Sequence, residues 1–290
     1  MEETWTILRV LHWTTDYFKR KGLAQPRADA EVLLAHVLKT ERIQLYLRFD
    51  QPLGLNELAT YRDAVKRRAG REPTQYITGK QEFWSLDLEV SPAVLIPRPE
   101  TELLVELGLK LLPKPGSKVL DLCTGSGAVA LAFAREREDL SIVATDRSVD
   151  AITLAKRNAA RNGLEHRIEF VAMDLFSALR SSEARFDCIV SNPPYIGDAE
   201  IPMLAPEVRD HEPLLALRGG GPAGIGVLSR ILAEFHPFLE PGGNLLLEIG
   251  ATQKETLEEK AHALPGRPAV AFHKDYADLT RILQITTGHR

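Results

Sequence analysis

The chain has 290 residues, of which 44% are hydrophobic and 26% are charged, and this composition is ordinary for a globular protein with one or two domains. Its net charge of −4 argues against stable nucleic-acid binding, and its longest apolar run, residues 128–134, is far too short to cross a membrane. Cys123 and Cys188 are too few for a disulfide framework, and residues 1–3 lack the basic start of an export signal, so we expect a cytoplasmic protein.

The beginning of the sequence predicts a small helical domain over residues 1–72. Apolar residues recur there at the i, i+3, i+4, i+7 spacing of an amphipathic helix, first at Ala30, Leu33, Leu34, Val37 and Leu38 and then at Leu55, Leu58, Ala59 and Val65. We expect this domain to be the docking surface for a protein substrate.

Charge is distributed unevenly along the chain. Residues 1–75 carry 13 Lys and Arg against 10 Asp and Glu, a net charge of +3, so the remainder carries −7. The basic cluster Lys66, Arg67, Arg68 and Arg71 is either a docking site for an acidic partner or RNA or, as we favour, a solvated helix face.

Residues 73–95 form a connector that begins beyond Gly70 with Pro73. Apolar residues alternate at Leu86, Leu88 and Val90, and this alternation over residues 83–90 predicts a strand in a β-hairpin.

Residues 96–290 form the body, in which strands alternate with helices. The predicted strands are residues 118–122, 141–145, 168–171, 186–191, 244–249, 269–273 and 282–285, and the predicted helices are residues 103–112, 128–137 and 149–162. Such alternation indicates a Rossmann-like α/β fold with a mostly parallel seven-stranded sheet, in which a ligand lies at the carboxyl ends of the strands.

A glycine-containing turn follows the first strand of this body and is a candidate cofactor site. Its residues are Asp121, Leu122, Cys123, Thr124, Gly125, Ser126 and Gly127. The two glycines allow a tight turn and a close approach to a ligand, but Ala130 stands where a dehydrogenase turn would have a third glycine. Asp121 either neutralises the charged end of a cofactor or anchors the turn.

Two further acids end neighbouring strands. Asp146 lies 19 residues beyond Gly127, where a carboxylate can accept hydrogen bonds from both ribose hydroxyls of an adenosine cofactor. Asp174 offers an acceptor for an adenine amino group, next to apolar cover from Leu175 and Phe176. A helix N-cap is the alternative role for both aspartates.

Asn192, Pro193, Pro194 and Tyr195 directly follow the strand predicted at residues 186–191. The side-chain oxygen of Asn192 and the carbonyl of Pro193 can accept hydrogen bonds from both N–H groups of one planar –NH2 group. The ring of Tyr195 would pack on this planar group. Because such a nitrogen is a poor nucleophile, alignment with the methyl group of S-adenosylmethionine is the main requirement for catalysis. We therefore expect methylation of a planar nitrogen, without a general base or a metal.

Several motifs, in their order along the chain, together resemble the HemK/PrmC family. They are Gln75-Tyr76-Ile77-Thr78-Gly79, Glu82-Phe83-Trp84, Pro97-Arg98-Pro99-Glu100-Thr101-Glu102, the turn 121–127, Asn192-Pro193-Pro194-Tyr195, His211-Glu212-Pro213 with Ala216-Leu217, and Leu247-Glu248-Ile249-Gly250. The resemblance implies a class I S-adenosylmethionine-dependent methyltransferase that modifies the glutamine side-chain nitrogen in the Gly-Gly-Gln motif of class-I peptide chain release factors.

The resemblance also implies roles for individual residues. It places the cofactor turn on residues 123–127, the ribose-binding acid on Asp146, an adenine contact on Leu175, and the shared cofactor and substrate motif on residues 192–195. The chain departs from the family in having Cys123 in place of a glycine and Leu175 where an aromatic residue is common. The glycine-rich loop 219–226 has Ala223 where the family has an acid, which leaves the role of that loop open.

Three alternatives remain at this point. The same tetrapeptide is similar to motifs of DNA adenine and RNA base methyltransferases, although the acidic body lacks an evident phosphate track. A related family methylates a ribosomal protein glutamine, and its loop differs from residues 98–102. The third alternative is a non-catalytic adaptor with the same fold, which would bind through the helical domain. The intact Gly125, Gly127, Asp146 and Asn192 disfavour it.

Overall fold

The computed structural model describes residues 4–112, 114–182 and 184–288, which form two compact units. One unit comprises residues 4–79 together with the segment 205–211, and the other comprises the described parts of residues 80–204 and 212–288. No helix among the described residues is long and apolar enough to span a membrane. The expectation about an export signal, drawn from residues 1–3, lies outside the described ranges.

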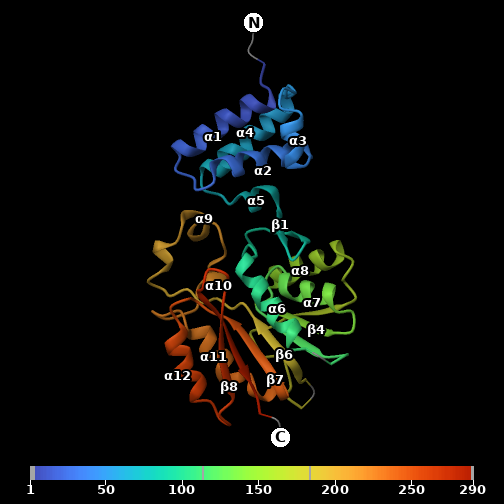
Figure 1. Ribbon diagram of the computed structural model, residues 1–290, viewed down its shortest axis with the longest axis vertical. Helices are drawn as coiled ribbons and strands as arrows, with labels where there is room; N and C mark the ends of the chain where they lie inside the picture. Colours follow the sequence, from blue (N-terminus) through green and yellow to red (C-terminus); the bar gives the residue numbers. More distant parts are fainter. Residues whose placement is uncertain (1–3, 113, 183, 289–290) are drawn as a thin grey trace. The chain divides into compact units, whose positions relative to one another are not determined.

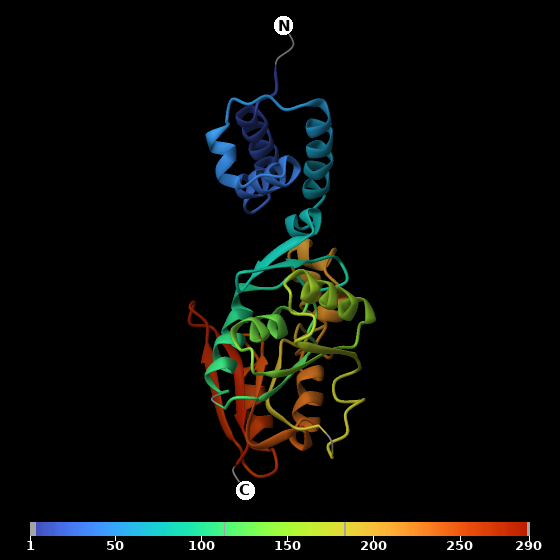
Figure 2. The same ribbon diagram turned by 90° about the vertical axis from the view of Figure 1, so that its right-hand side faces the viewer.

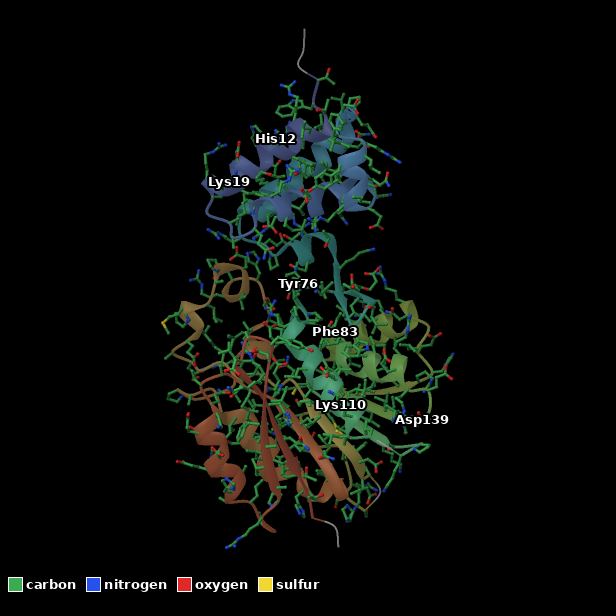
Figure 3. All side chains as sticks on the ribbon, in the orientation of Figure 1. His12, Lys19, Tyr76, Phe83, Lys110 and Asp139 are labelled. Carbon is green, nitrogen blue, oxygen red and sulfur yellow. The ribbon has the colours of Figure 1, made fainter. Side chains whose placement is uncertain are left out.

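The first unit is helical (Figure 1), and its apolar core comes from residues before position 80. Its helices are α1 (Ile7–Arg20), α2 (Pro26–Leu38), α3 (Arg42–Leu47), α4 (Leu55–Ala69), α5 (Thr74–Thr78) and the short α9 (Pro206–Arg209). The predicted repeats in α2 and α4 bury Leu33, Leu34 and Val65 against Phe18 of α1. The unit extends beyond residue 72 because Tyr76, labelled in Figure 3, and Ile77 on α5 are also buried.

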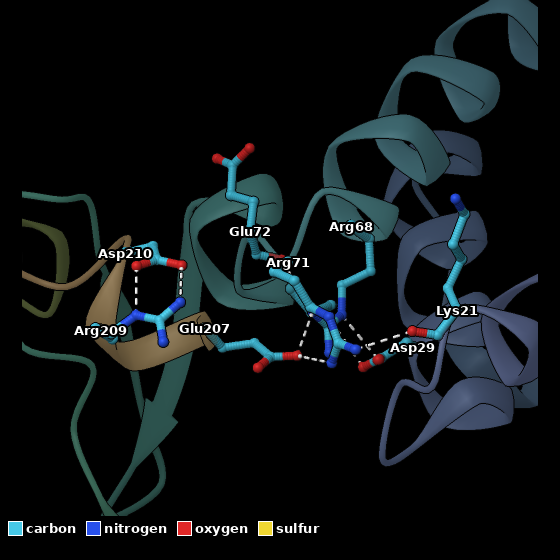
Figure 4. Close-up of polar contacts among 9 residues, drawn as sticks. Lys21, Asp29, Arg68, Arg71, Glu72, Glu207, Arg209 and Asp210 are labelled. Atoms are coloured by element: carbon cyan, nitrogen blue, oxygen red, sulfur yellow. Dashed lines mark hydrogen bonds and ion pairs between the residues drawn. The ribbon is translucent and has the colours of Figure 1, made fainter. Parts of the chain in front are cut away.

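Most of the basic cluster forms ion pairs within this unit (Figure 4). Arg68, whose side chain is 8% exposed, bonds Asp29 at 2.8 Å and Glu207 at 3.2 Å, and Arg71 bonds the same oxygen of Glu207 at 3.2 Å. Arg67 pairs with Glu72. The expectation of a solvated helix face is therefore wrong for Arg68, because its guanidinium neutralises two carboxylates, one of them from the distant segment 205–211.

A β-hairpin opens the second unit. Strand β1 (Lys80–Phe83) pairs antiparallel with β2 (Leu86–Glu89), and Trp84 and Ser85 form the turn with φ values of 51° and 57°. The predicted hairpin is confirmed, but the single strand over residues 83–90 is interrupted at its start by this turn. Phe83, labelled in Figure 3, is buried and anchors the hairpin in the core of the body.

The body is a seven-stranded sheet with the order β5-β4-β3-β6-β7-β9-β8. Its strands are β3 (Lys118–Leu122), β4 (Ser141–Asp146), β5 (Ile168–Ala172), β6 (Phe186–Ser191), β7 (Leu239–Glu248), β8 (Ala269–Lys274) and β9 (Thr280–Thr286). All neighbouring pairs are parallel except those that involve β9. The predicted Rossmann-like fold with a mostly parallel sheet is confirmed.

Helices cover both faces of this sheet (Figures 1 and 2). The helical segments of the second unit are η1 (Pro99–Thr101), α6 (Glu102–Lys110), α7 (Ala128–Glu136), α8 (Val149–Arg161), η2 (Ile201–Met203), α10 (Leu214–Leu217), α11 (Gly226–Glu234), η3 (His236–Phe238) and α12 (Lys254–His262). Leu246 of β7 packs in the same cluster as α6 and α7, whereas its neighbours Leu245 and Leu247 pack in the cluster of α11 and α12. This alternation shows that β7 is buried on both faces.

The sheet order places the sequence motifs side by side. The chain runs from β3 through β4 to β5 on one side and then returns to β6 on the other side of β3, so the order reverses between β3 and β6. Leu122, the last residue of β3, pairs with Ser191 of β6 and with Thr145 of β4. The segments that follow these strands therefore leave the same edge of the sheet, where doubly wound folds bind their ligands.

Candidate active site

The turn after β3 has the backbone that the glycines were expected to allow. Gly125 and Gly127 have φ values of 56° and 84°, and the N–H of Thr124 donates to the carbonyl of Thr145 at 2.9 Å. A Cβ atom at Gly125 would meet no other atom within 4 Å, so this face of the turn is open to a ligand. Cys123 has a φ of 58°, which is the left-handed conformation that a glycine adopts without strain.

Asp121 lies beneath this turn and is only 1% exposed. Its Oδ2 accepts hydrogen bonds from the Thr124 hydroxyl at 2.6 Å and from the N–H of Ala130 at 3.2 Å. Burial raises the pKa of Asp121 to about 7. Of the two roles considered for Asp121, these contacts favour the anchor of the turn over direct neutralisation of a ligand.

Asp146 ends β4 as predicted and faces the turn. Its two carboxylate oxygens accept hydrogen bonds from the N–H groups of Gly125, at 2.9 Å, and Ser148, at 2.8 Å. Burial raises its pKa, while the N–H groups of Ser148 and Gly125 act in the opposite direction. Each carboxylate oxygen has a second lone pair available for the hydroxyl groups of a ligand.

Asp174 lies just beyond the end of β5 and is bound by a residue that was not singled out from the sequence. Arg230 of α11 bonds its two oxygens at 3.3 and 3.1 Å. The next residue, Leu175, is buried and has a φ of 49°. Arg230 carries no local motif, so only the packing of α11 reveals this contact.

A cavity of about 350 Å³ lies at this edge of the sheet, within the usual size range of small-molecule sites. It collects most of the predicted site residues: Asp121, Cys123, Thr124, Gly125, Ser126, Asp146, Asp174, Leu175, Asn192 and Pro194. Gly127, Pro193 and Tyr195 do not line it, although they belong to the same two motifs. The remaining wall includes Pro97, Thr101, Pro213 and Leu215.

Asn192 is held by a chain of hydrogen bonds, of which the one between Thr101 and Glu248 is buried. Its Nδ2 donates to the Thr101 hydroxyl at 3.0 Å, and that hydroxyl donates to Oε2 of Glu248 at 2.7 Å. The Tyr195 hydroxyl donates to Oε1 of the same carboxylate at 3.2 Å. The phenol of Tyr195 is thus directed to Glu248, and the expectation that its ring packs on the substrate amide has no direct support from this arrangement.

Neither Thr101 nor Glu248 was assigned a role from the sequence, although both lie in the motifs that carry the family resemblance. Glu248 is 2% exposed, and burial raises its pKa to about 7, while hydrogen bonds from Thr101 and Tyr195 act in the opposite direction. Glu248 interrupts the apolar stretch 245–249, and such a carboxylate was the available signal, because ionisable residues are seldom buried without a specific partner.

A second buried carboxylate joins two other motifs. Glu212, with a side chain that is 1% exposed, forms an ion pair with Arg98 and accepts a hydrogen bond from the N–H of Ile96 at 3.2 Å. This ion pair holds the chain at residue 212, directly before Pro213 and Leu215, which line the cavity.

The loop 219–226 supports the backbone that leaves the Asn192 motif. A Cβ atom at Gly224 would overlap the carbonyl oxygen of Tyr195 and lie 2.6 Å from the N atom of Gly197. Gln253 donates to the carbonyls of Tyr195, at 2.7 Å, and Ala223, at 2.8 Å. The loop therefore acts through its backbone, and none of these contacts requires an acidic side chain at residue 223.

Comparisons with known proteins agree with this architecture. Residues 9–79 match the PrmC N-terminal domain family, and residues 100–207 match the methyltransferase small domain family. A methyltransferase of known structure from Pyrococcus furiosus has the same fold, with a TM-score of 0.52, 22% identity, and coverage of 70% of this chain and 89% of that one.

Curated relatives match at higher identity. The release factor glutamine methyltransferase of Geobacter sulfurreducens is 45% identical over 255 residues, which cover 88% of each chain. That of Escherichia coli strain K12 is 41% identical, over 93% of this chain and 96% of the relative. Because this similarity spans both units at such identity, the chain belongs to the release factor glutamine methyltransferase family.

Proposed function

We propose that this protein transfers the methyl group of S-adenosylmethionine to the side-chain amide nitrogen, N5, of the glutamine in the Gly-Gly-Gln motif of class-I peptide chain release factors. The observation that carries this proposal is the position of Asn192, which lines one cavity together with the glycine turn and Asp146. The names of the relatives from G. sulfurreducens and E. coli support the substrate class.

The residues of the cavity fit the proposed cofactor. The open face of Gly125 admits close approach of a ligand, and the carboxylate of Asp146 offers acceptors for ribose hydroxyls. Leu175 and Val227 supply apolar surface in the same cavity, and Asp174, bound to Arg230, lies next to Leu175 as an acceptor for the adenine amino group. S-adenosylmethionine would supply an electrophilic methyl group on its sulfonium.

The substrate amide would be bound by acceptors of this chain. Oδ1 of Asn192, a residue that lines the cavity, is proposed to accept a hydrogen bond from one N–H group of the substrate amide. The carbonyl of Pro193, a residue that does not itself line the cavity, is proposed to accept from the other, with Pro194 stiffening the turn. No general base is needed before transfer, because the nitrogen becomes acidic only once it carries the methyl group; its proton then leaves to water. Orientation of the amide nitrogen toward the methyl group is thus the main contribution of the protein.

The helical unit is proposed to dock the body of the release factor. It exposes Trp13 at 50% and Trp5 at 40%, both on the wall of a groove of about 370 Å³ that Arg62 and Lys66 also line. Exposed aromatic residues next to cations are typical of protein interfaces. Replacement of Trp13 by Ala is expected to raise KM for an intact factor at least threefold and to leave KM for a short Gly-Gly-Gln peptide unchanged; an equal change for both would contradict docking.

The activity is tested with labelled S-adenosylmethionine. The protein is incubated separately with a purified class-I release factor, the same factor with its Gly-Gly-Gln glutamine changed to alanine, and undermodified DNA and RNA. Label on the intact factor alone is expected. Label on nucleic acid alone would replace the proposal by methylation of a base amino group.

The role of Asn192 is tested in the same assay. Because Asn192→Ala removes an acceptor for the substrate amide, we expect a loss of about a hundredfold in kcat, with a much smaller change in cofactor affinity. An unchanged rate would remove Asn192 from the mechanism.

A further inference from the structure

We propose that Thr101 and Glu248 are positioning residues that fix the orientation of the Asn192 amide, so that its oxygen, and not its nitrogen, faces the substrate. This inference rests on the proposed function, since it concerns how the substrate amide is held. The contacts that carry it are the two consecutive hydrogen bonds from Asn192 to Thr101 and from Thr101 to Glu248.

The direction of this chain follows from the number of hydrogens on each group. An ionised carboxylate can only accept, and a threonine hydroxyl has a single hydrogen to donate. Because the hydroxyl of Thr101 donates that hydrogen to Glu248, it can only accept from Asn192. The –NH2 end of the Asn192 amide must therefore face Thr101, which leaves the oxygen as the end available in the cavity.

The orientation matters because the two ends of an asparagine amide have nearly the same shape and opposite hydrogen-bonding character. A flipped amide would present two donors to a substrate –NH2 group that itself has two hydrogens to donate, and binding would lose its acceptor. Thr101 and Glu248 are 4% and 2% exposed, so the hydrogen bond between them is shielded from bulk water.

Tyr195 completes the arrangement by donating to the other oxygen of Glu248. The carboxylate thereby binds both Asn192, through Thr101, and the last residue of the same motif. Glu248 ends β7, Thr101 ends η1, and residues 192–195 follow β6, so the network connects three segments that are distant in sequence.

A protonated Glu248 would no longer fix the orientation of the Asn192 amide. A neutral carboxyl group can donate to the Thr101 hydroxyl, and that hydroxyl can then donate its own hydrogen to Asn192. The groups that face Glu248 are Thr101 and Tyr195 through hydrogen bonds and Arg281 and Glu100 through their charges. Burial raises the pKa of Glu248 to about 7, which puts this change in an accessible range. We expect kcat to fall as the pH decreases below about 7.

Two matched substitutions separate orientation from packing. Thr101→Val keeps the volume of the side chain and removes the hydroxyl, whereas Thr101→Ser keeps the hydroxyl and removes a methyl group. We expect kcat on the release factor to fall at least tenfold in Thr101→Val and less than threefold in Thr101→Ser, with the Kd for S-adenosylmethionine within twofold of wild type in both. The opposite order, or equal rates, would overturn the proposal and assign Thr101 to packing.

A measurement on the ligand-free wild type covers the case in which Thr101→Val does not fold. The NMR signals of the Asn192 side-chain amide are expected to shift with the same midpoint as the carboxyl carbon of Glu248 when the pH is varied. The proposal would be refuted if the chemical shifts of the Asn192 side-chain amide did not change as Glu248 titrates. A wild-type enzyme that does not methylate release factor would refute the proposed function alone, because this titration needs no substrate.

Discussion

Gly224 allows the sharpest test of the close packing behind the Asn192 motif. A Cβ atom at this position would overlap the carbonyl oxygen of Tyr195 and lie 2.6 Å from the N atom of Gly197, and the residue has a φ of 67°. The left-handed conformation costs an alanine about 1 kcal/mol, and overpacking against backbone adds roughly 1–3 kcal/mol. We therefore expect Gly224→Ala to lower the free energy of unfolding by about 2–4 kcal/mol.

The same loop supplies the control. Gly221 has a φ of 73°, but a Cβ atom there would meet nothing within 4 Å, so Gly221→Ala should show only the conformational cost of about 1 kcal/mol. Urea denaturation followed by circular dichroism measures both variants. Because Gly224→Ala displaces Tyr195, its kcat should also fall, while Gly221→Ala should retain normal turnover. Equal stabilities of the two variants, within about 0.5 kcal/mol, would refute the close approach.

Three further predictions concern the cofactor turn and the cavity wall. Cys123→Gly should leave the free energy of unfolding unchanged or raise it by up to about 1 kcal/mol, because glycine adopts the positive φ of this residue without strain. Cys123→Val should lower the free energy of unfolding by about 2 kcal/mol. The reverse order of the two variants in urea denaturation would contradict backbone strain at Cys123. Glu212→Ala should cost about 3 kcal/mol in the same measurement, because it leaves the Arg98 guanidinium without its buried partner, and a loss below about 1 kcal/mol would show that this pair is solvated. Burial raises the pKa of Asp121 to about 7 in the folded protein, so ionisation of this carboxyl lowers the free energy of unfolding as the pH rises from about 4 to 7. Asp121→Asn should make that decline less steep. Parallel curves of the free energy of unfolding against pH for wild type and variant would contradict this prediction.

The elements of the body were predictable because each is encoded locally. Strands β3 and β6 were predicted at their observed bounds from short apolar runs, and their βα turns from glycine and proline. Helices α11 and α12 were not assigned from the sequence, and they supply Arg230 at the rim and the cover of one sheet face. Their role depends on how they pack, which the apolar pattern alone does not determine.

The basic cluster shows a similar limit. The charges of Arg68 and Arg71 are evident from the sequence, but their partner Glu207 lies more than 130 residues away. An external acidic partner and solvent were the two alternatives for this cluster, but Arg68 and Arg71 instead pair with an internal carboxylate. A charged residue within a helical repeat does not specify which segment will neutralise it.

The sequence by itself determined the fold class, the order of the motifs and the candidate acceptor Asn192, since each depends on residue types at fixed short spacings. Only the tertiary structure decided that Thr101 and Glu248 hold that acceptor, and that the loop 219–226 supports it through backbone contacts. The physical reason is that a buried hydrogen bond joins residues that the packing of β6, β7 and η1 brings together, 147 positions apart in the case of Thr101 and Glu248. Local patterns specify the elements, whereas the partners of a buried polar group are specified by the assembled core.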